Sequence, residues 1–389
     1  MPYPLSCPYP DCPAHSHPPP HWCVRFGRYS TAAHGSVQRY RCLLCGHCSS
    51  DQTESVHYFA KRRLPLKAIY LSLLGGASLR EIARRYSISC PAVANALLRL
   101  GRQSMAAHLT LLHRLNPRHS LVYDGLRSFI TSQDFPCDIT TVVEAEGETI
   151  LSMTHTVFRR GGTMRPAQRS RMDRKLLVWK PRPGCMKADI SLLIRELWDY
   201  LRPSFAHPAV IHTDEHPLYR SLLDADHTAA HFRLLGLFCH SRTPGSAARA
   251  MDNPLFPVNY VDRLLRHRLK EHTRETIAFG RNATMQMHRA WIFAFDHNCC
   301  REHRVRRPQE GSHAEQGAVD RSTAAELRRQ FFQRRIRIAE EGVPQSIKRV
   351  WMAELATPPV RWKAGQSSNT LRIPRYAVRD LGVLDQQAS

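Results

Sequence analysis

The sequence has no uninterrupted apolar run of 18 or more residues, and no charged segment followed by an apolar one after Met1. A membrane-spanning helix needs about 20 apolar residues, and a secretory leader needs that tandem arrangement. We therefore expect neither a transmembrane nor a secreted chain. Internal repeats and long low-complexity tracts are also missing, and 389 residues are enough for two or three domains.

Acidic residues are scarce compared with basic ones. The chain has 33 Asp and Glu against 56 Lys and Arg, which gives a formal net charge of +23. Such an excess indicates a polyanionic partner, either nucleic acid or an anionic membrane surface. Because hydrophobic residues make up 42% of the chain, it can bury a core. A folded nucleic-acid binder is the interpretation that fits both observations.

Cysteines are concentrated at the start of the chain, where residues 1–55 hold six of the 12. CxxC-type spacing without a leader favours metal binding over disulfides. Two knuckles about 30 residues apart can supply a tetrahedral zinc site, and the predicted ligands are Cys7, Cys12, Cys42 and Cys45. A loop with scattered thiols is the alternative. Further candidate ligands nearby are Cys23, Cys48, His15, His17 and His21.

Residues 60–115 switch to a helical periodicity. An apolar stripe predicts a first helix over 66–74, which a glycine pair ends. Ser78 and Glu81 form a capping box for a second helix over 79–86. This part of the chain is therefore expected to be helical.

A short turn leads to a third helix over 92–100, which Ser89 caps and Gly101 ends. In a helix-turn-helix of this spacing the second helix enters the DNA major groove while the first crosses the phosphates. An ordinary helical hairpin is the alternative. The predicted DNA contacts on these helices are Arg80, Asn95 and Arg99.

Two aspartates stand on predicted strands later in the chain. A strand over 121–129 presents Asp124, and a strand over 209–214 ends in Asp214. Between them we predict two strands, a basic loop and an amphipathic helix, over 139–144, 149–157, 159–182 and 188–201. This order, with carboxylates at the ends of the first and fourth strands, is that of an RNase H-like mixed five-stranded sheet with flanking helices.

Carboxylates in that arrangement fit two-metal chemistry. Two Mg²⁺ or Mn²⁺ ions about 4 Å apart activate an attacking hydroxyl and stabilise the leaving oxygen, and such hard cations prefer oxygen ligands. A single aspartate at a strand end is more often a turn cap. The order of the two strands and the net charge favour Asp124 and Asp214 as metal ligands.

A third acid is expected from the amphipathic segment over 253–276. At about 100° per residue, Asp262 lies on one flank of its apolar stripe and Glu275 on the other, while Glu271 points further out. Asp262 is the predicted ligand, with Glu275 and Glu271 as alternatives. A solvated helix whose acids pair with arginines four residues away is the other interpretation. The basic face is expected to contact phosphates through residues such as Arg263 and Arg266.

With these motifs, most of residues 1–300 resembles the DDE/D transposases of short bacterial insertion sequences, most closely the insertion-sequence-one type. The matching segments are 39–46, 78–83, 122–124, 212–214, 261–263 and 274–276 followed by Phe279. The resemblance implies that Asp124 and Asp214 are the first two metal ligands. The third position departs from the family, which usually has glutamate where this chain has Asp262.

The resemblance implies a transposase that binds terminal inverted repeats, hydrolyses a phosphodiester and joins the freed 3′-hydroxyl to target DNA. It also implies catalytic Mg²⁺ or Mn²⁺, structural Zn²⁺, double-stranded DNA as partner, a homo-oligomer on DNA, and a place in the bacterial cytoplasm at the nucleoid. The expected domains are a zinc ribbon (1–55), a helix-turn-helix (60–115), the RNase H-like catalytic domain (118–300) and a basic C-terminal tail with a helix (301–389).

Other functions remain open at this point. A non-catalytic DNA-binding regulator, or an inactivated transposase derivative, would keep the first two domains and use the third as a scaffold. An RNA-binding protein fits less well, because a helix-turn-helix suits the B-form major groove. A cysteine enzyme fits least, since Cys239, Cys299 and Cys300 have no recognisable nucleophile setting.

Overall fold

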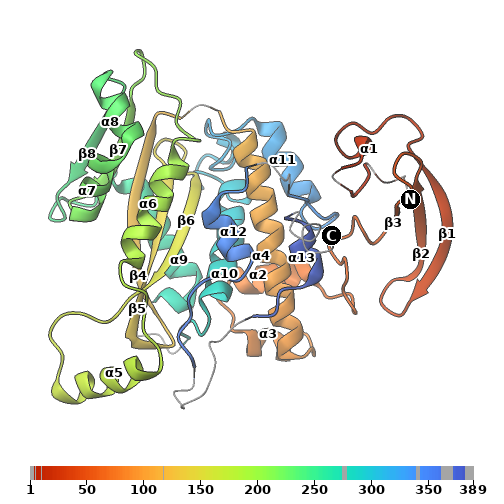
Figure 1. Cartoon of the computed structure of the whole chain (residues 1–389), viewed down its shortest axis with the longest axis horizontal. Coiled ribbons are helices and arrows are strands. Elements are labelled where there is room, and N and C mark those ends of the chain that lie inside the picture. Colours follow the sequence, from red (N-terminus) through yellow and green to blue (C-terminus); the bar gives the residue numbers. More distant parts are fainter. Residues whose placement is uncertain are drawn as a thin grey trace.

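The computed structural model describes residues 4, 6–9, 11–116, 118–273, 278–338, 342–360 and 371–381. They form a small antiparallel sheet, a larger mixed sheet of five strands, and helices that flank the larger sheet (Figure 1). The prediction of a multidomain α/β chain with a mixed five-stranded sheet and flanking helices is confirmed. Within the described part of the chain, every helix is too short or too polar to span a bilayer.

The small sheet lies at one end of the molecule (Figure 1). It comprises β1 (Cys23–Thr31), β2 (Gly35–Cys42) and β3 (Cys48–Ser50), all antiparallel, and follows the short helix α1 (Pro13–Ser16). Its own core consists mainly of cysteines and aromatics, including Trp22 and Tyr40. A core with so few aliphatic side chains gives little hydrophobic stabilisation, so this unit depends on other contacts.

Three helices follow: α2 (Leu66–Leu74), α3 (Leu79–Arg85) and α4 (Cys90–His113). The Ser78 side chain accepts from the Glu81 amide at 3.2 Å and the Ser89 side chain from the Ala92 amide at 3.3 Å, as the sequence predicts. The Glu81 carboxylate pairs with Arg85 at 3.3 Å, so the second half of the predicted capping box does not form. The predicted end at Gly101 is wrong, because α4 continues for three more turns. Gly101 instead allows close packing on α10 (Ala283–Phe295), where an added Cβ would lie 2.1 Å from Nδ1 of His288.

The five strands of the larger sheet have the order β6-β5-β4-β7-β8. Their bounds are Ser120–Ile130 (β4), Ser132–Glu144 (β5), Ile150–Val157 (β6), Ala209–Asp214 (β7) and Phe238–Thr243 (β8). The first three are antiparallel neighbours, whereas β4, β7 and β8 run parallel. The parallel connections pass through helices: α6 (Cys185–Leu197) leads to β7, and α7 (Pro217–Ala225) with α8 (His227–Leu234) leads to β8.

Each face of this sheet has its own core, because side chains alternate along a strand. On one face Val122 and Leu126 of β4 belong to the same cluster as residues of α4, α9 (Phe256–Arg268) and α10. On the other face Leu121 and Tyr123 pack with α6 and α7. The sheet is thus covered on both sides, which buries most of β5 and β6.

The basic segment over 159–182, predicted as a loop, contains the helix α5 (Pro166–Val178). This helix lies at the edge of the molecule, below the ends of β4 and β5 (Figure 1), and its Met172 is buried. Two of its cations hold it to the start of β5, since Arg171 and Lys175 contact the Asp134 carboxylate at 3.1 and 2.7 Å. Its other basic side chains remain available to a partner.

The described residues after 301 pack against the rest of the fold. Their helices are η3 (Pro308–Glu310), α11 (Arg321–Gln330), α12 (Gln345–Trp351) and α13 (Arg375–Arg379). Two short helices precede residue 301, η1 (Lys270–His272) and η2 (Asp296–Cys300). Phe331, Ile347 and Trp351 are buried in the same cluster as α4 and α10. What the sequence suggested as a basic tail therefore contributes to the central core.

Candidate functional site

The first candidate site is a cluster of four cysteines. Cys7, Cys12, Cys42 and Cys45 bring their sulfurs within 4.8 Å of one another. The pairs Cys7–Cys45 and Cys12–Cys42 are each 3.6 Å apart. Zn–S bonds of about 2.3 Å place tetrahedral sulfurs roughly 3.8 Å apart. The four predicted cysteines therefore form a cluster suited to zinc.

Backbone geometry around this cluster supports metal binding. Gly46 adopts φ 73° just after Cys45, and its amide donates to the Cys42 carbonyl at 3.0 Å, which closes the turn. Burial raises the pKa of the Cys7 and Cys12 thiols, whereas at Cys42 hydrogen bonds from the amides of Cys45 and Leu44 outweigh burial and lower the pKa. A lowered thiol pKa favours the thiolate form that binds metals.

The other residues considered as ligands lie outside the cluster. Cys23 pairs with Cys42 across β1 and β2, and Cys48 pairs with Arg41 across β2 and β3. Neither belongs to the group of converging sulfurs. His15 contacts the Cys7 carbonyl through Nδ1 at 2.7 Å. This histidine thus orients the backbone of a ligand and does not compete with it.

The second candidate site is a cavity of about 580 Å³ beside the larger sheet. Three predicted acids line it, Asp124 from β4, Asp214 from β7 and Asp262 from α9. Strand register explains the first two: β4 pairs with β7 through Val122 and His212, so the two aspartates lie two residues further at the same level and on the same face. Helix α9 covers that face and adds the third.

The three candidates for the third acid differ in position. Asp262 is 6% exposed and lines the cavity. Glu271 does not line it, and its carboxylate lies 3.7 Å from the Arg289 guanidinium in a separate buried contact. Glu275 lies outside the described residues. Of the two acids whose positions are described, Asp262 is the one that joins Asp124 and Asp214.

Two of these three carboxyls, Asp124 and Asp262, have a raised pKa and so resist ionisation. Burial raises the pKa of Asp124 to about 6, and the charges of Asp214 and Asp138 add to it, against a hydrogen bond from the Gly125 amide. Burial also raises the pKa of Asp262 well above its usual range, with Asp124 as the next cause. Such shifts are typical of acids that are grouped for metal binding or catalysis.

Sequence reasoning missed a fourth acid, Asp138 of β5, which also lines the cavity. It pairs with Arg127 on the opposite face of the strands from Asp124. Its carboxylate lies over Gly125, where an added Cβ would be 2.5 Å from Oδ2. The one sequence signal is an aspartate between Cys137 and Ile139 inside an apolar strand.

The cavity fits divalent cations in its donor set. Asp262 has a buried Oδ1 without a hydrogen-bond partner, next to an acid whose pKa is also raised. A cation would satisfy this oxygen and relieve the repulsion between the acids. Among the described residues, ligand atoms of three or more side chains converge within 4.8 Å at two other places, not here. The acids are therefore spread more widely than around a single ion.

Basic side chains surround these acids. Those that line the cavity are Arg127, Arg249, Arg263 and Arg266. Arg263 lies over the Tyr260 ring at 5.5 Å, and Nε of Arg266 is buried without a hydrogen-bond partner. Acids inside and cations around them suit a polyanionic substrate held across metal ions.

The predicted DNA contacts on the helices have different environments. Arg80 on α3 and Asn95 on α4 are exposed. Arg99 instead donates to the Val56 carbonyl at 2.9 Å and lies over the Tyr376 ring at 5.1 Å. Its guanidinium is therefore used inside the protein, and the prediction that it contacts DNA does not fit this arrangement.

Neither the models of known protein families nor the curated proteins contain a match to this chain. The chemistry of the two sites is therefore the basis for assigning a function.

Proposed function

We propose that this protein is a DNA transposase of the DDE/D type, related to those of short bacterial insertion sequences. It would bind the terminal inverted repeats of its element, hydrolyse a phosphodiester and transfer the freed 3′ end to target DNA. The observation that carries this proposal is the meeting of Asp124, Asp214 and Asp262 in one cavity bordered by arginines.

The strand order supports the proposal. A sheet of order β6-β5-β4-β7-β8, with the last three strands parallel, agrees with an RNase H-like catalytic domain. In that interpretation Asp124 stands on the central strand and Asp214 on its parallel neighbour. A fold alone does not define an activity, so the weight rests on the acids that it brings together.

The N-terminal elements support a DNA-binding role. The four-cysteine cluster with its three-stranded sheet fits a zinc ribbon. Helices α3 and α4, with Arg80 and Asn95 exposed, fit a helix-turn-helix. Because α4 continues into the core as far as His113, DNA bound at its start would be held rigidly relative to the sheet.

The acids have distinct roles in this proposal. Asp124 and Asp214, side by side on neighbouring strands, would hold two Mg²⁺ or Mn²⁺ ions together with Asp262 from the covering helix. When bound, such ions activate the attacking hydroxyl and stabilise the leaving oxygen. Arg263 and Arg266 would hold the phosphates that flank the reacting one. Asp138, paired with Arg127 at 3.0 Å, would fix the edge of the site.

Strand cleavage tests the proposal. The substrate is a supercoiled plasmid that carries the genomic DNA flanking the coding sequence on both sides. We expect Mg²⁺- or Mn²⁺-dependent nicking at a fixed position. Asp124→Asn, Asp214→Asn and Asp262→Asn should each reduce it by about 100-fold or more, since even indirect partners of a catalytic metal contribute about 10- to 100-fold.

Glu271→Gln is the matched control, because it neutralises another buried carboxyl that lies outside the cavity. It should keep the nicking activity. Specific binding of the flanking DNA by every protein, without cleavage by the wild type in either metal, would contradict the enzyme. That outcome would favour a DNA-binding regulator or an inactivated transposase derivative.

A further inference from the structure

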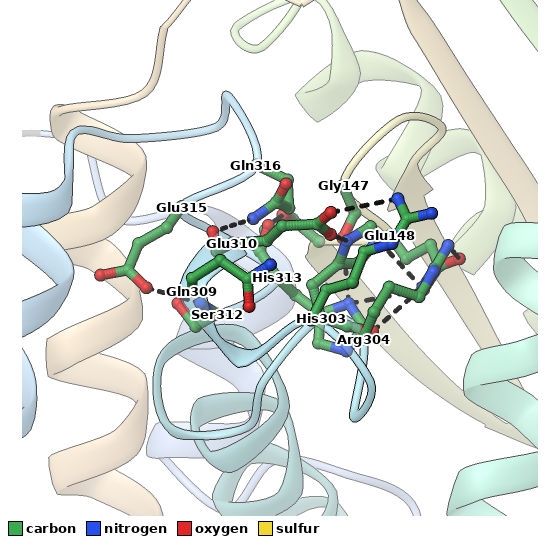
Figure 2. A network of polar contacts seen from close by, with 12 residues as sticks. Gly147, Glu148, His303, Arg304, Gln309, Glu310, Ser312, His313, Glu315 and Gln316 are labelled. Atoms are coloured by element: carbon green, nitrogen blue, oxygen red, sulfur yellow. Dashed lines mark hydrogen bonds and ion pairs between the residues drawn. The ribbon is translucent and has the colours of Figure 1, made fainter.

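A cluster of two histidines and a glutamate lies outside both sites described above (Figure 2). The turn between β5 and β6 contributes Glu148, and the segment that follows η2 contributes His303 and His313. One ligand atom from each lies within 4.8 Å of the others. The side chains of Glu148 and His313 are 2% and 0% exposed, and that of His303 is 10% exposed.

The turn that carries Glu148 is fixed by other bonds. The Glu144 carboxylate accepts from the amides of Glu146 and Gly147 at 2.8 and 2.7 Å. Glu148 itself has φ 58°, a backbone conformation that side chains with a Cβ rarely adopt. His297 donates from Nε2 to its carbonyl at 2.8 Å. The carboxylate is therefore positioned before any ligand arrives.

We propose that Glu148, His303 and His313 form a second zinc-type site besides the four-cysteine cluster, which takes a divalent transition-metal ion such as Zn²⁺. Oε2 of Glu148 lies 3.4 Å from Nδ1 of His313 and 3.8 Å from Nε2 of His303. Zn–N and Zn–O bonds of about 2.0–2.1 Å place tetrahedral ligands roughly 3.4 Å apart. Nδ1 of His313 also contacts the Gly147 carbonyl at 3.0 Å, so an ion bound through this nitrogen replaces that contact, or the ring turns to present its unpartnered Nε2.

Unpartnered nitrogens point to the same conclusion. Both ring nitrogens of His303, and Nε2 of His313, are buried without a hydrogen-bond partner. Buried polar atoms are normally satisfied by protein, water or a metal. Neutral imidazole is a common ligand of Zn²⁺ and other late transition metals. Three protein ligands leave the fourth position of a tetrahedral ion to water.

Arg304 is the competing partner for the carboxylate. Its guanidinium donates to both oxygens of Glu148, at 2.9 and 3.0 Å (Figure 2). A carboxylate has about four lone-pair sites, so an ion on the histidine side of Oε2 leaves room for this pair. The arginine side chain is 35% exposed and can also move away. Its positive charge weakens metal binding by repulsion.

The site connects to the acidic cavity through Tyr260. The Tyr260 ring lies 6.1 Å from the ring of His313 and lines the cavity beside Arg263. An ion at the second site would join the β5–β6 turn to the segment after η2. It would thereby fix the position of His313, whose ring lies beside that of Tyr260 in the cavity wall.

Metal content and spectroscopy test the proposal on the full-length chain. After equilibration with Zn²⁺ and removal of the excess, we expect two equivalents per chain in the wild type. His303→Asn and Cys12→Ser should each retain one. With Co²⁺, Cys12→Ser should keep weak visible bands without thiolate charge-transfer absorption, whereas His303→Asn should keep that absorption. One equivalent in the wild type, unchanged by His303→Asn, would overturn the proposal.

Arg304→Gln makes the test independent of folding failure. Removal of the neighbouring positive charge removes its repulsion of the ion. Binding of the second equivalent of Zn²⁺ should therefore tighten by about tenfold, which corresponds to about 1.4 kcal/mol. A variant with a damaged fold would not gain affinity. Unchanged or weaker binding of the second equivalent by Arg304→Gln would overturn the proposed position of the ion.

Discussion

The acids of the cavity are buried and raise one another's pKa, although their oxygens do not converge on a single point. Asp124 and Asp262 both have a raised pKa, chiefly through burial and then through each other or through neighbouring aspartates. Gly125 permits this crowding, because the Asp138 carboxylate occupies the space where its side chain would be. These residues therefore reduce the stability of the metal-free fold in favour of a site for positive charge.

A first prediction concerns Asp124 and pH in the absence of metal. Its pKa in the folded state is about 6, above the value of 3.8 for an exposed aspartate. The folded state thus binds the proton more tightly, and stability should fall as pH rises from about 4 through 6. Asp124→Asn removes this loss. The shift corresponds to about 3 kcal/mol, which partial exposure reduces, so we expect a gain of about 1–2 kcal/mol at pH 7.5.

Urea unfolding in EDTA at pH 4.5 and 7.5 measures this difference. Asp252→Asn is the control, because that aspartate is exposed and its replacement should change stability little at either pH. If Asp124→Asn were no more stable than the wild type at pH 7.5, the Asp124 carboxyl would ionise without penalty, and the crowding of the acids would have no energetic cost.

Helices α4 and α10 pack closely at Gly101. Among the glycines that the structure describes, this is the one whose added Cβ would lie closest to a neighbouring atom. At Gly101 a methyl group would lie 2.1 Å from Nδ1 and 2.7 Å from Cβ of His288. His288 is 0% exposed, so its ring cannot turn into solvent. Overpacking of this kind forces backbone shifts. This contact determines how α4 sits against the core.

Gly101→Ala should therefore lower the free energy of unfolding by about 1–3 kcal/mol, although alanine is the better helix former. Gly75→Ala serves as the comparison, since its added Cβ would meet its nearest neighbour at 3.4 Å and should alter stability by less than about 0.5 kcal/mol. Urea unfolding of both variants measures the effect. Equal stability of the two would mean that α4 and α10 do not approach this closely.

Local patterns predict well where one element determines the outcome. The bounds of α2 and β7 agree with the sequence, and the side chains of Ser78 and Ser89 cap their helices as predicted. The prediction that Gly101 ends its helix was wrong, because a glycine that allows close helix packing cannot be told in sequence from one that ends a helix. The fifth strand, β8, is short and partly exposed, so alternation of apolar residues marks it poorly.

The candidate site was predictable to a similar degree and for the same reason. Asp214 follows from a strand end and the four cysteines from their spacing, whereas Asp124 lies inside β4 (Ser120–Ile130) and not at its end. Asp138 could not be identified, since its place in the cavity depends on register with Arg127 and on the missing side chain of Gly125. The interior position of Arg99 depends on contacts with Val56 and Tyr376, which the sequence of α4 alone cannot indicate.

At the scale of the whole molecule, part of the net charge of +23 comes from a basic segment that leads to the acidic cavity. The segment over 159–182 holds nine Lys and Arg with one acid. Met186, just after it, lines the cavity of Asp124. Helix α5 in this segment has exposed arginines at 169, 171 and 174, and the exposed Arg165 precedes its first residue. A duplex that reached the acids could therefore continue along α5.

The last prediction tests this path through the salt dependence of DNA binding. Arg169→Gln together with Arg174→Gln removes two exposed cations but keeps the contacts of Arg171 and Lys175 with Asp134. If both arginines neutralise phosphates, the slope of log K against log salt should fall by about 2. Arg321→Gln together with Arg329→Gln, on α11, changes the net charge equally and should leave the slope nearly unchanged. The same loss of slope in both double variants would mean that binding follows net charge and does not depend on α5. An unchanged slope in the α5 variant would exclude this helix from the DNA contact.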